Sequence, residues 1–147
     1  MYPMTLFETG ESNGTVSLSR ILEDADYDID GMISGCDLES LFFAACRGGW
    51  PRCMALKKDM AKLEIAKDYY KQIYRKDISA IDGINRNPEW TRALLWSYAR
   101  NMATTAKKKN IFADVKATQN VTDATLFSYV DALENLFVVR DIDALSL

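Results

Sequence analysis

The sequence predicts an all-α, mainly helical protein with little β-structure. Apolar residues recur at the three- and four-residue spacing of one helix face over most of the chain, and residues that commonly cap helices precede these stretches. Only residues 137–139, Phe-Val-Val, have the character of a short strand. Apolar residues make up 48% of the 147 residues, which is enough for a buried core and more than disordered chains carry.

The pattern divides the chain into three parts. Residues 1–16 are rich in turn formers, so we expect an extended lead and loop. Residues 17–86 form a helical subdomain, and residues 87–147 form a second subdomain that resembles a truncated winged helix.

Within the helical subdomain, capping residues mark where helices begin. Ser17 opens a short helix, and Asp37 caps a second one that Gly48 and Gly49 end. Pro51 suits the first turn of one long helical stretch. The apolar residues that define these helix faces are Leu18, Ile21 and Leu22, then Leu38, Leu41, Phe42 and Ala45, and finally Met60, Leu63, Ala66, Tyr70 and Ile73.

Three further helices are predicted in the C-terminal part. Asn87, followed by Pro88, begins a helix that reaches about Thr104; Thr105 begins the next one, and Thr122 caps the last. The residues expected to face the core are Leu94, Leu95, Tyr98, Met102, Ile111, Phe112, Val115, Leu126, Tyr129, Val130, Leu133 and Leu136. Three helices with a tight turn before the last and a strand after it match a winged-helix or helix-turn-helix unit that lacks its wing.

Composition argues against an enzyme. The chain has no histidine, which removes the commonest general base and the usual activation of serine and cysteine nucleophiles. Its three cysteines, Cys36, Cys46 and Cys53, are too far apart for a typical zinc site and suit a reducing, cytoplasmic environment. Carboxylates such as Glu8 and Glu11 fall in predicted loops rather than on rigid elements. No apolar stretch is long enough to cross a membrane.

An acidic loop matches part of a calcium-binding motif. Asp26, Asp28 and Asp30 occupy the first, third and fifth places of an EF-hand loop, and Gly31 occupies the sixth. Asp37 stands at the twelfth place, where the longer glutamate normally closes the site. We therefore favour a solvated turn over an EF-hand-like metal site.

The nucleic-acid candidates are basic residues near the predicted second C-terminal helix. Lys107, Lys108 and Lys109 form a cluster that Arg100 and Lys116 could support, and such lysines hold phosphates without reading sequence. The third helix carries acidic and hydroxyl residues but no basic ones, so it is unsuited to reading bases. Sequence-tolerant DNA binding is therefore an alternative function rather than the first one.

Several short motifs resemble the domain of unknown function 4143 that follows the ATP-binding module of bacterial and archaeal AAA+-type (P-loop) ATPases. They lie in residues 4–14, 77–83 and 125–134 and in two further runs. The residues that carry these two runs are Arg47, Gly48, Gly49, Trp50 and Pro51, and Tyr98, Arg100 and Asn101. The resemblance implies that ATP and magnesium bind an upstream module, because this chain has no phosphate-binding loop.

The function expected from these observations is a non-catalytic accessory domain of an AAA+-type ATPase that docks proteins or couples domains, with no cofactor of its own. Its partners would be other domains of the ATPase, or a second copy bound through exposed apolar ends. These ends lie near Met4, Leu6 and Phe7 and at residues 137–139.

Overall fold

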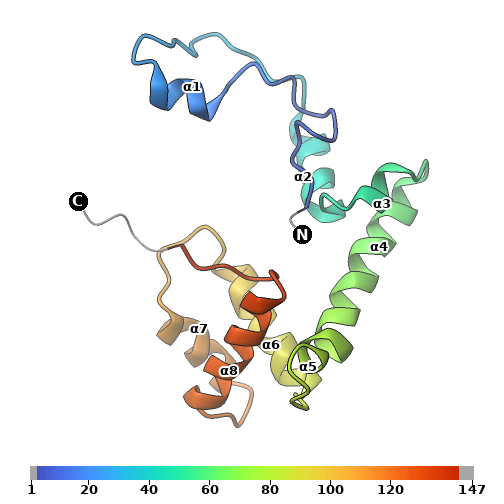
Figure 1. The fold of residues 1–147 in the computed structure, drawn as a ribbon, viewed down its shortest axis with the longest axis vertical. Coiled ribbons are helices and arrows are strands. Elements are labelled where there is room, and N and C mark those ends of the chain that lie inside the picture. Colours follow the sequence, from blue (N-terminus) through green and yellow to red (C-terminus); the bar gives the residue numbers. More distant parts are fainter. Residues whose placement is uncertain (1–2, 143–147) are drawn as a thin grey trace. The chain divides into compact units, whose positions relative to one another are not determined.

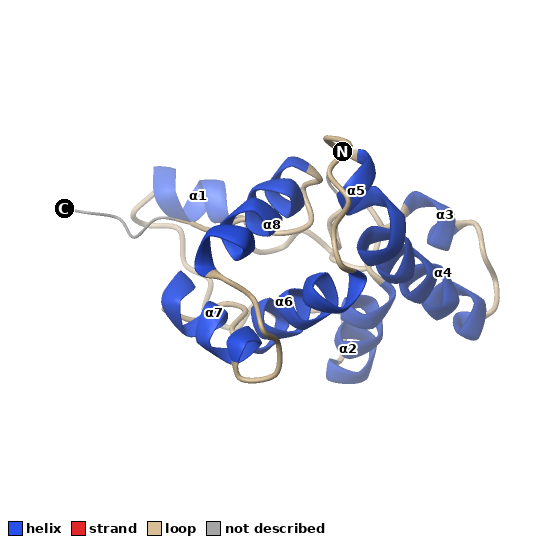
Figure 2. Ribbon diagram, turned by 90° about the horizontal axis from the view of Figure 1, so that it is seen from below, coloured by secondary structure: helices blue, strands red, loops and turns tan. Residues whose placement is uncertain are grey.

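The computed structural model describes residues 3–142, and every regular element in this range is a helix (Figure 2). The mainly helical fold predicted from the sequence is therefore confirmed. The chain divides into two compact units, Met1–Asp68 and Tyr69–Leu147. Each unit is described by itself below, with the helix labels of Figure 1.

The first unit contains short helices joined by long loops. They are α1 (Leu18–Glu23), α2 (Leu38–Arg47), α3 (Pro51–Met54) and the beginning of α4 (Asp59–Gln72). The predicted caps are confirmed, because the side chain of Ser17 accepts from the Arg20 amide and that of Asp37 accepts from the Ser40 amide. The single long stretch expected after Pro51 is instead two helices, since the turn at residues 55–58 separates α3 from α4.

A buried arginine organises the corner between α2 and α3. The Arg47 side chain is almost fully buried and donates from Nη1 and Nη2 to the two carboxylate oxygens of Glu11, at 2.9 and 2.8 Å. The hydrogen bonds from Arg47 lower the pKa of the Glu11 carboxyl, and a bond from Thr9 adds to the effect. The Met4 amide also donates to the Gly49 carbonyl. The lead therefore packs against this corner rather than forming a free extension.

The apolar faces predicted for the first unit exist, but most of them are exposed. Leu38, Leu41 and Phe42 share one face of α2, and all three are more than 40% exposed. Helix α4 has no buried residue, and Met60 is exposed rather than inward. The described residues of this unit bury only Ala44, Arg47 and Cys53.

The second unit has a well-packed core. The chain continues from α4 through a π-helical segment, η1 (Ile73–Asp77), into α5 (Ile78–Ala80), and then through α6 (Pro88–Arg100), α7 (Lys108–Lys116) and α8 (Asp123–Asn135). Asn87 and Thr122 cap α6 and α8 as predicted. The core contains Ile73, Ile78, Leu94, Ile111, Phe112, Val115, Val121, Leu126, Tyr129, Val130, Ala132 and Leu133.

This core explains why the units divide after Asp68 and not between residues 86 and 87. Ile73 and Ile78, which precede the expected boundary, pack in one cluster with residues of α6, α7 and α8. The apolar contacts of η1 and α5 therefore belong to the C-terminal unit.

The ends of the C-terminal helices differ from the prediction. Helix α6 ends at Arg100 rather than near Thr104, so Met102 lies in the following turn and is 75% exposed. Helix α7 begins at Lys108 rather than at Thr105.

Residues 137–139 form no strand, because they end α8 instead. Phe137 adopts a left-handed conformation with φ of 58°, and its amide donates to the Glu134 carbonyl. The Val138 amide donates to the Leu133 carbonyl. This is the hydrogen-bond pattern of a Schellman helix end, so these residues cap the helix and do not pair with another strand.

A second buried arginine holds the C-terminal unit together. The Arg86 side chain donates to both carboxylate oxygens of Asp82, at 2.7 and 2.6 Å, and to the carbonyl oxygens of Ile78 and Ser128. Its guanidinium lies 5.6 Å from the centre of the Tyr129 ring. One side chain thus connects α5, the loop before α6 and the middle of α8.

Replacing this arginine should destabilise the C-terminal unit. In Arg86→Met the carbonyls of Ile78 and Ser128 lose a donor, and the expected loss in the free energy of unfolding is about 2–3 kcal/mol. Urea unfolding followed by circular dichroism measures it, with Arg75→Met as the control because Arg75 is exposed. Equal midpoints for the two variants would show that Arg86 is not required.

The Asp82–Arg86 pair should also make stability depend on pH. The hydrogen bond from Arg86, with a smaller effect from the Ile84 amide, lowers the pKa of Asp82 to about 2 from its ordinary 3.8. Because the folded pKa is lowered, the stabilisation is complete above about pH 4 and is lost as the pH falls toward about 2. The melting temperatures of wild type and Asp82→Asn should therefore differ at about pH 6 and converge at about pH 2. A difference that stays constant over this range would contradict the assignment.

Candidate functional site: an open groove along helix α6

Helix α6 has two faces of different chemistry. Thr91, Leu94 and Ser97 are its buried residues and face the core. Arg92, Trp96 and Arg100 follow one another at four-residue spacing on the other side, where Trp96 is 61% exposed. Because residues four apart are neighbours on a helix, they form a continuous row, which we call the Arg–Trp–Arg row.

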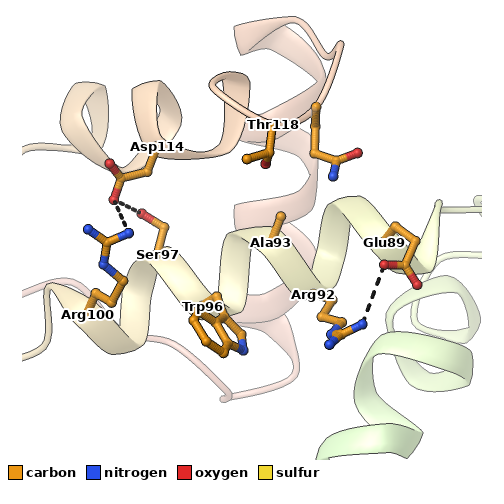
Figure 3. A pocket seen from close by; sticks show the side chains of 9 residues that line it. Glu89, Arg92, Ala93, Trp96, Ser97, Arg100, Asp114 and Thr118 are labelled. Atoms are coloured by element: carbon orange, nitrogen blue, oxygen red, sulfur yellow. Dashed lines mark hydrogen bonds and ion pairs between the residues drawn. The ribbon is translucent and has the colours of Figure 1, made fainter.

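The row lines an open groove of about 330 Å³ between α6 and α7. Asp114 of α7 and Thr118 and Gln119, which follow α7, form the opposite wall. Figure 3 shows Trp96 between the two arginines along α6, with Arg100 turned toward Asp114 and Arg92 beside Glu89. All of these residues belong to the C-terminal unit.

A buried hydroxyl fixes α7 against α6 beneath the groove. The Ser97 hydroxyl lies 3.2 Å from the Ile111 carbonyl and 3.0 Å from Oδ2 of Asp114, so it donates to one of these two oxygens at a time. Its side chain is almost fully buried. This contact holds the Asp114 carboxylate in place at the edge of the groove.

Both arginines of the row are only loosely neutralised. Arg92 Nη1 lies 3.7 Å from Glu89, and Arg100 Nη1 lies 3.9 Å from Asp114. These distances exceed a hydrogen bond, and the arginine side chains are 53% and 68% exposed, so the ion pairs are weak. Each guanidinium therefore keeps donors that a ligand oxygen can accept.

The groove combines two guanidinium groups with an exposed indole. Guanidinium groups bind carboxylates or phosphates through two parallel hydrogen bonds, and an indole offers a large apolar face between them. The sequence contains this pattern as Arg-x-x-x-Trp-x-x-x-Arg, but of the three residues only Arg100 is predicted from it as a site residue. The row becomes recognisable only once the register of α6 shows which residues face outward.

The lysine cluster predicted as a phosphate site is partly neutralised. Lys108 lies 3.4 Å from Glu134 and 3.1 Å from Asp141, and Lys116 pairs with Asp123 at 2.6 Å. Lys107 and Lys109 are exposed, and neither forms an ion pair within residues 3–142. Arg100 lines the groove instead of adding to this cluster.

The structure does not gather the carboxylates of the calcium-like loop into a metal site. Asp37 uses its side chain to cap α2, and Asp28 accepts a hydrogen bond from the Asp30 amide. Across the part of the chain that the structure describes, no three cysteine or carboxylate side chains are placed to hold a metal ion. Asp26, Asp28, Asp30 and Asp37 are therefore not assembled as an EF-hand requires.

The motif residues around Gly48 and Tyr98 have local structural roles. Gly48 adopts a left-handed φ of 73° at the end of α2, and Trp50 and Pro51 begin α3. Asn101 ends α6 and donates to the Ser97 carbonyl.

A second cleft of about 710 Å³ is lined by the end of α6, the loop before α7 and residues 138–142. Tyr98 lies in it, and its hydroxyl is 3.5 Å from Asp141. Burial raises the pKa of Tyr98, and the negative charge of Asp141 raises it further. The tyrosine therefore stays neutral and acts as a hydrogen-bond donor.

The residues that the structure describes form a mainly helical protein, and comparison with known proteins gives the family. A family model described as Domain of unknown function (DUF8612) matches residues 38–147, and the chain belongs to this family. The resemblance to the domain found in AAA+-type ATPases is therefore wrong. No curated protein and no solved structure matches the chain. In residues 3–142, no helix is both long and apolar enough to cross a membrane.

Proposed function

We propose that the C-terminal unit is a non-catalytic protein-interaction module that docks an acidic segment of a partner in the α6–α7 groove. The observation that carries this proposal is the exposed Trp96 between two loosely paired arginines. Tryptophan and arginine are the residues most enriched among those that dominate binding energy at protein interfaces.

Charge and rigidity support the same function. The loosely held guanidinium groups of Arg92 and Arg100 give one wall of the groove a positive row, and Glu89 and Asp114 carry an equal formal negative charge elsewhere in the lining. An acidic partner is therefore favoured by the exposed donors of the row and not by a net positive charge of the groove. The row lies on a thirteen-residue helix whose opposite face is buried, so the binding groups are held in place before a partner arrives. Preorganisation of this kind reduces the entropy that binding costs.

Selection of displayed random peptides on the immobilised protein tests the proposal. We expect enrichment of peptides that combine acidic residues with an apolar one, and we expect Trp96→Ala to lose at least about tenfold in affinity for them. Met102→Ala is the matched control, because Met102 is also an exposed apolar side chain but lies outside the groove.

The charge of the row should matter as much as the indole. Arg92→Glu with Arg100→Glu should abolish binding of the selected peptides, whereas Lys109→Glu changes an exposed charge outside the groove and should not. Enrichment that is the same on wild type and Trp96→Ala would contradict the proposed function.

Nucleic acid is the second candidate ligand, favoured by the exposed Lys107 and Lys109. Arginine, lysine and an exposed tryptophan are the groups that hold single strands without reading sequence, by phosphate contacts and base stacking. Helices α6, α7 and α8 follow the order of a helix-turn-helix unit, which also suits this function. Against it, α8 carries Asp123, Asp131 and Glu134 and no basic residue.

Fluorescence anisotropy with a labelled thymidine oligonucleotide separates the two candidates. Protein docking predicts no binding at about 50 mM salt. Nucleic-acid binding predicts an affinity that falls steeply toward about 200 mM salt and weakens in Lys107→Ala with Lys109→Ala. Lys116→Ala is the control, because Lys116 is already paired with Asp123. Binding of this kind would replace the proposed function with a phosphate-gripping role.

A further inference from the structure

The geometry of the groove points to the form of the acidic segment that it binds, and this inference rests on the proposed function. We infer that the occupant is a short extended peptide segment with acidic residues at positions i and i+4 and an apolar residue at i+2. The two carboxylates bind Arg92 and Arg100, and the apolar side chain packs on Trp96.

The spacing of the row sets the spacing of the acids. Arg92 and Arg100 are eight residues apart on α6, and a helix rises about 1.5 Å per residue, so their backbone positions lie about 12 Å apart. An extended chain advances about 3.3 Å per residue and covers this distance in about four residues. Side chains at i, i+2 and i+4 of an extended segment point to the same side. Trp96, midway between the arginines, then faces position i+2.

An extended segment also fits the size of the groove better than a helix does. The groove holds about 330 Å³ and is open to solvent. Two turns of a helix that is about 10 Å across occupy about 850 Å³ with their side chains. Three side chains of an extended segment need less room than a whole helix. The opposite wall is formed partly by the small Thr118 side chain and the Gln119 amide, which leaves space above α6 and offers polar partners.

The two acidic residues beside the row leave both arginines able to bind a peptide carboxylate. Glu89 and Asp114 lie beyond hydrogen-bond distance of Arg92 and Arg100, so they hold the guanidinium groups near the groove without occupying their donors. Ser97 competes for the Asp114 carboxylate at 3.0 Å. A peptide carboxylate that forms two parallel hydrogen bonds therefore gains more from each arginine than these acids do.

Two labelled peptides of the same composition test the spacing. One carries the core Glu-Ser-Leu-Ser-Glu, and the other carries Ser-Glu-Leu-Glu-Ser, in which the acids point to the opposite side from the leucine. Measured by anisotropy on the full chain, the first should bind about tenfold more tightly, since each correctly placed charge contributes a few-fold at an exposed site. This preference should disappear in Trp96→Ala.

Reversal of charge gives an independent test. The variant Arg92→Glu with Arg100→Glu should lose the acidic peptide and bind Lys-Ser-Leu-Ser-Lys in its place, which a change in folding would not produce. Equal affinity of wild type for the two acidic peptides, with binding still lost in Trp96→Ala, would overturn the spacing and leave the proposed function standing. If peptide binding does not depend on Trp96, or only the oligonucleotide binds, both fail.

Discussion

The C-terminal unit depends on the burial of one charged side chain. Arg86 is withdrawn from water, and such a charge is tolerated only when its hydrogen-bonding groups find partners. Asp82, the Ile78 carbonyl and the Ser128 carbonyl accept from Nη1 and Nη2, whereas the buried Nε has no partner among the described residues. The three partners come from three separate segments. Next in the chain, the Asn87 amide donates to the Tyr129 hydroxyl, and the Asn87 side chain caps α6. The contacts of Arg86 and Asn87 therefore fix where α6 begins against α8, and the core residues on its inner face set its rotation.

The rotation of α6 determines which residues a partner can reach. With Leu94 and Ser97 turned to the core, helical geometry places Trp96 and its two arginines outward. Isolated apolar residues on a surface are common and need no explanation. Trp96 differs because loosely paired arginines flank it at the edge of a groove, the combination that interfaces favour. The buried Arg86, paired with the exposed Asp82, and the apolar core behind α6 together support the surface that we propose to be functional.

Local signals in the sequence predicted well where helices begin. Which charges are paired depends on contacts between residues that are distant in sequence. Ser17, Asp37, Asn87 and Thr122 were identified as caps because their side chains act within three residues. The neutralisation of Lys108 was not predictable, since its partners Glu134 and Asp141 are distant in sequence. Residues 137–139 have the composition of a strand, yet the backbone amides of Phe137 and Val138 donate to carbonyls of α8 and form its Schellman end. Short motifs likewise suggested an ATPase family that the match over residues 38–147 contradicts.

The two units differ in how their arginines are satisfied, and this difference favours the C-terminal unit as the site of function. Arg47 obtains both of its carboxylate contacts from Glu11, which precedes the family-matched residues, whereas every partner of Arg86 lies within them. The described residues of the first unit bury few side chains, so little holds a binding surface rigid there. In the second unit a continuous core supports the back of α6. Binding groups that must be placed precisely need rigid support. The C-terminal unit gives the groove on α6 this support, and the first unit offers no comparable support to a surface of its own.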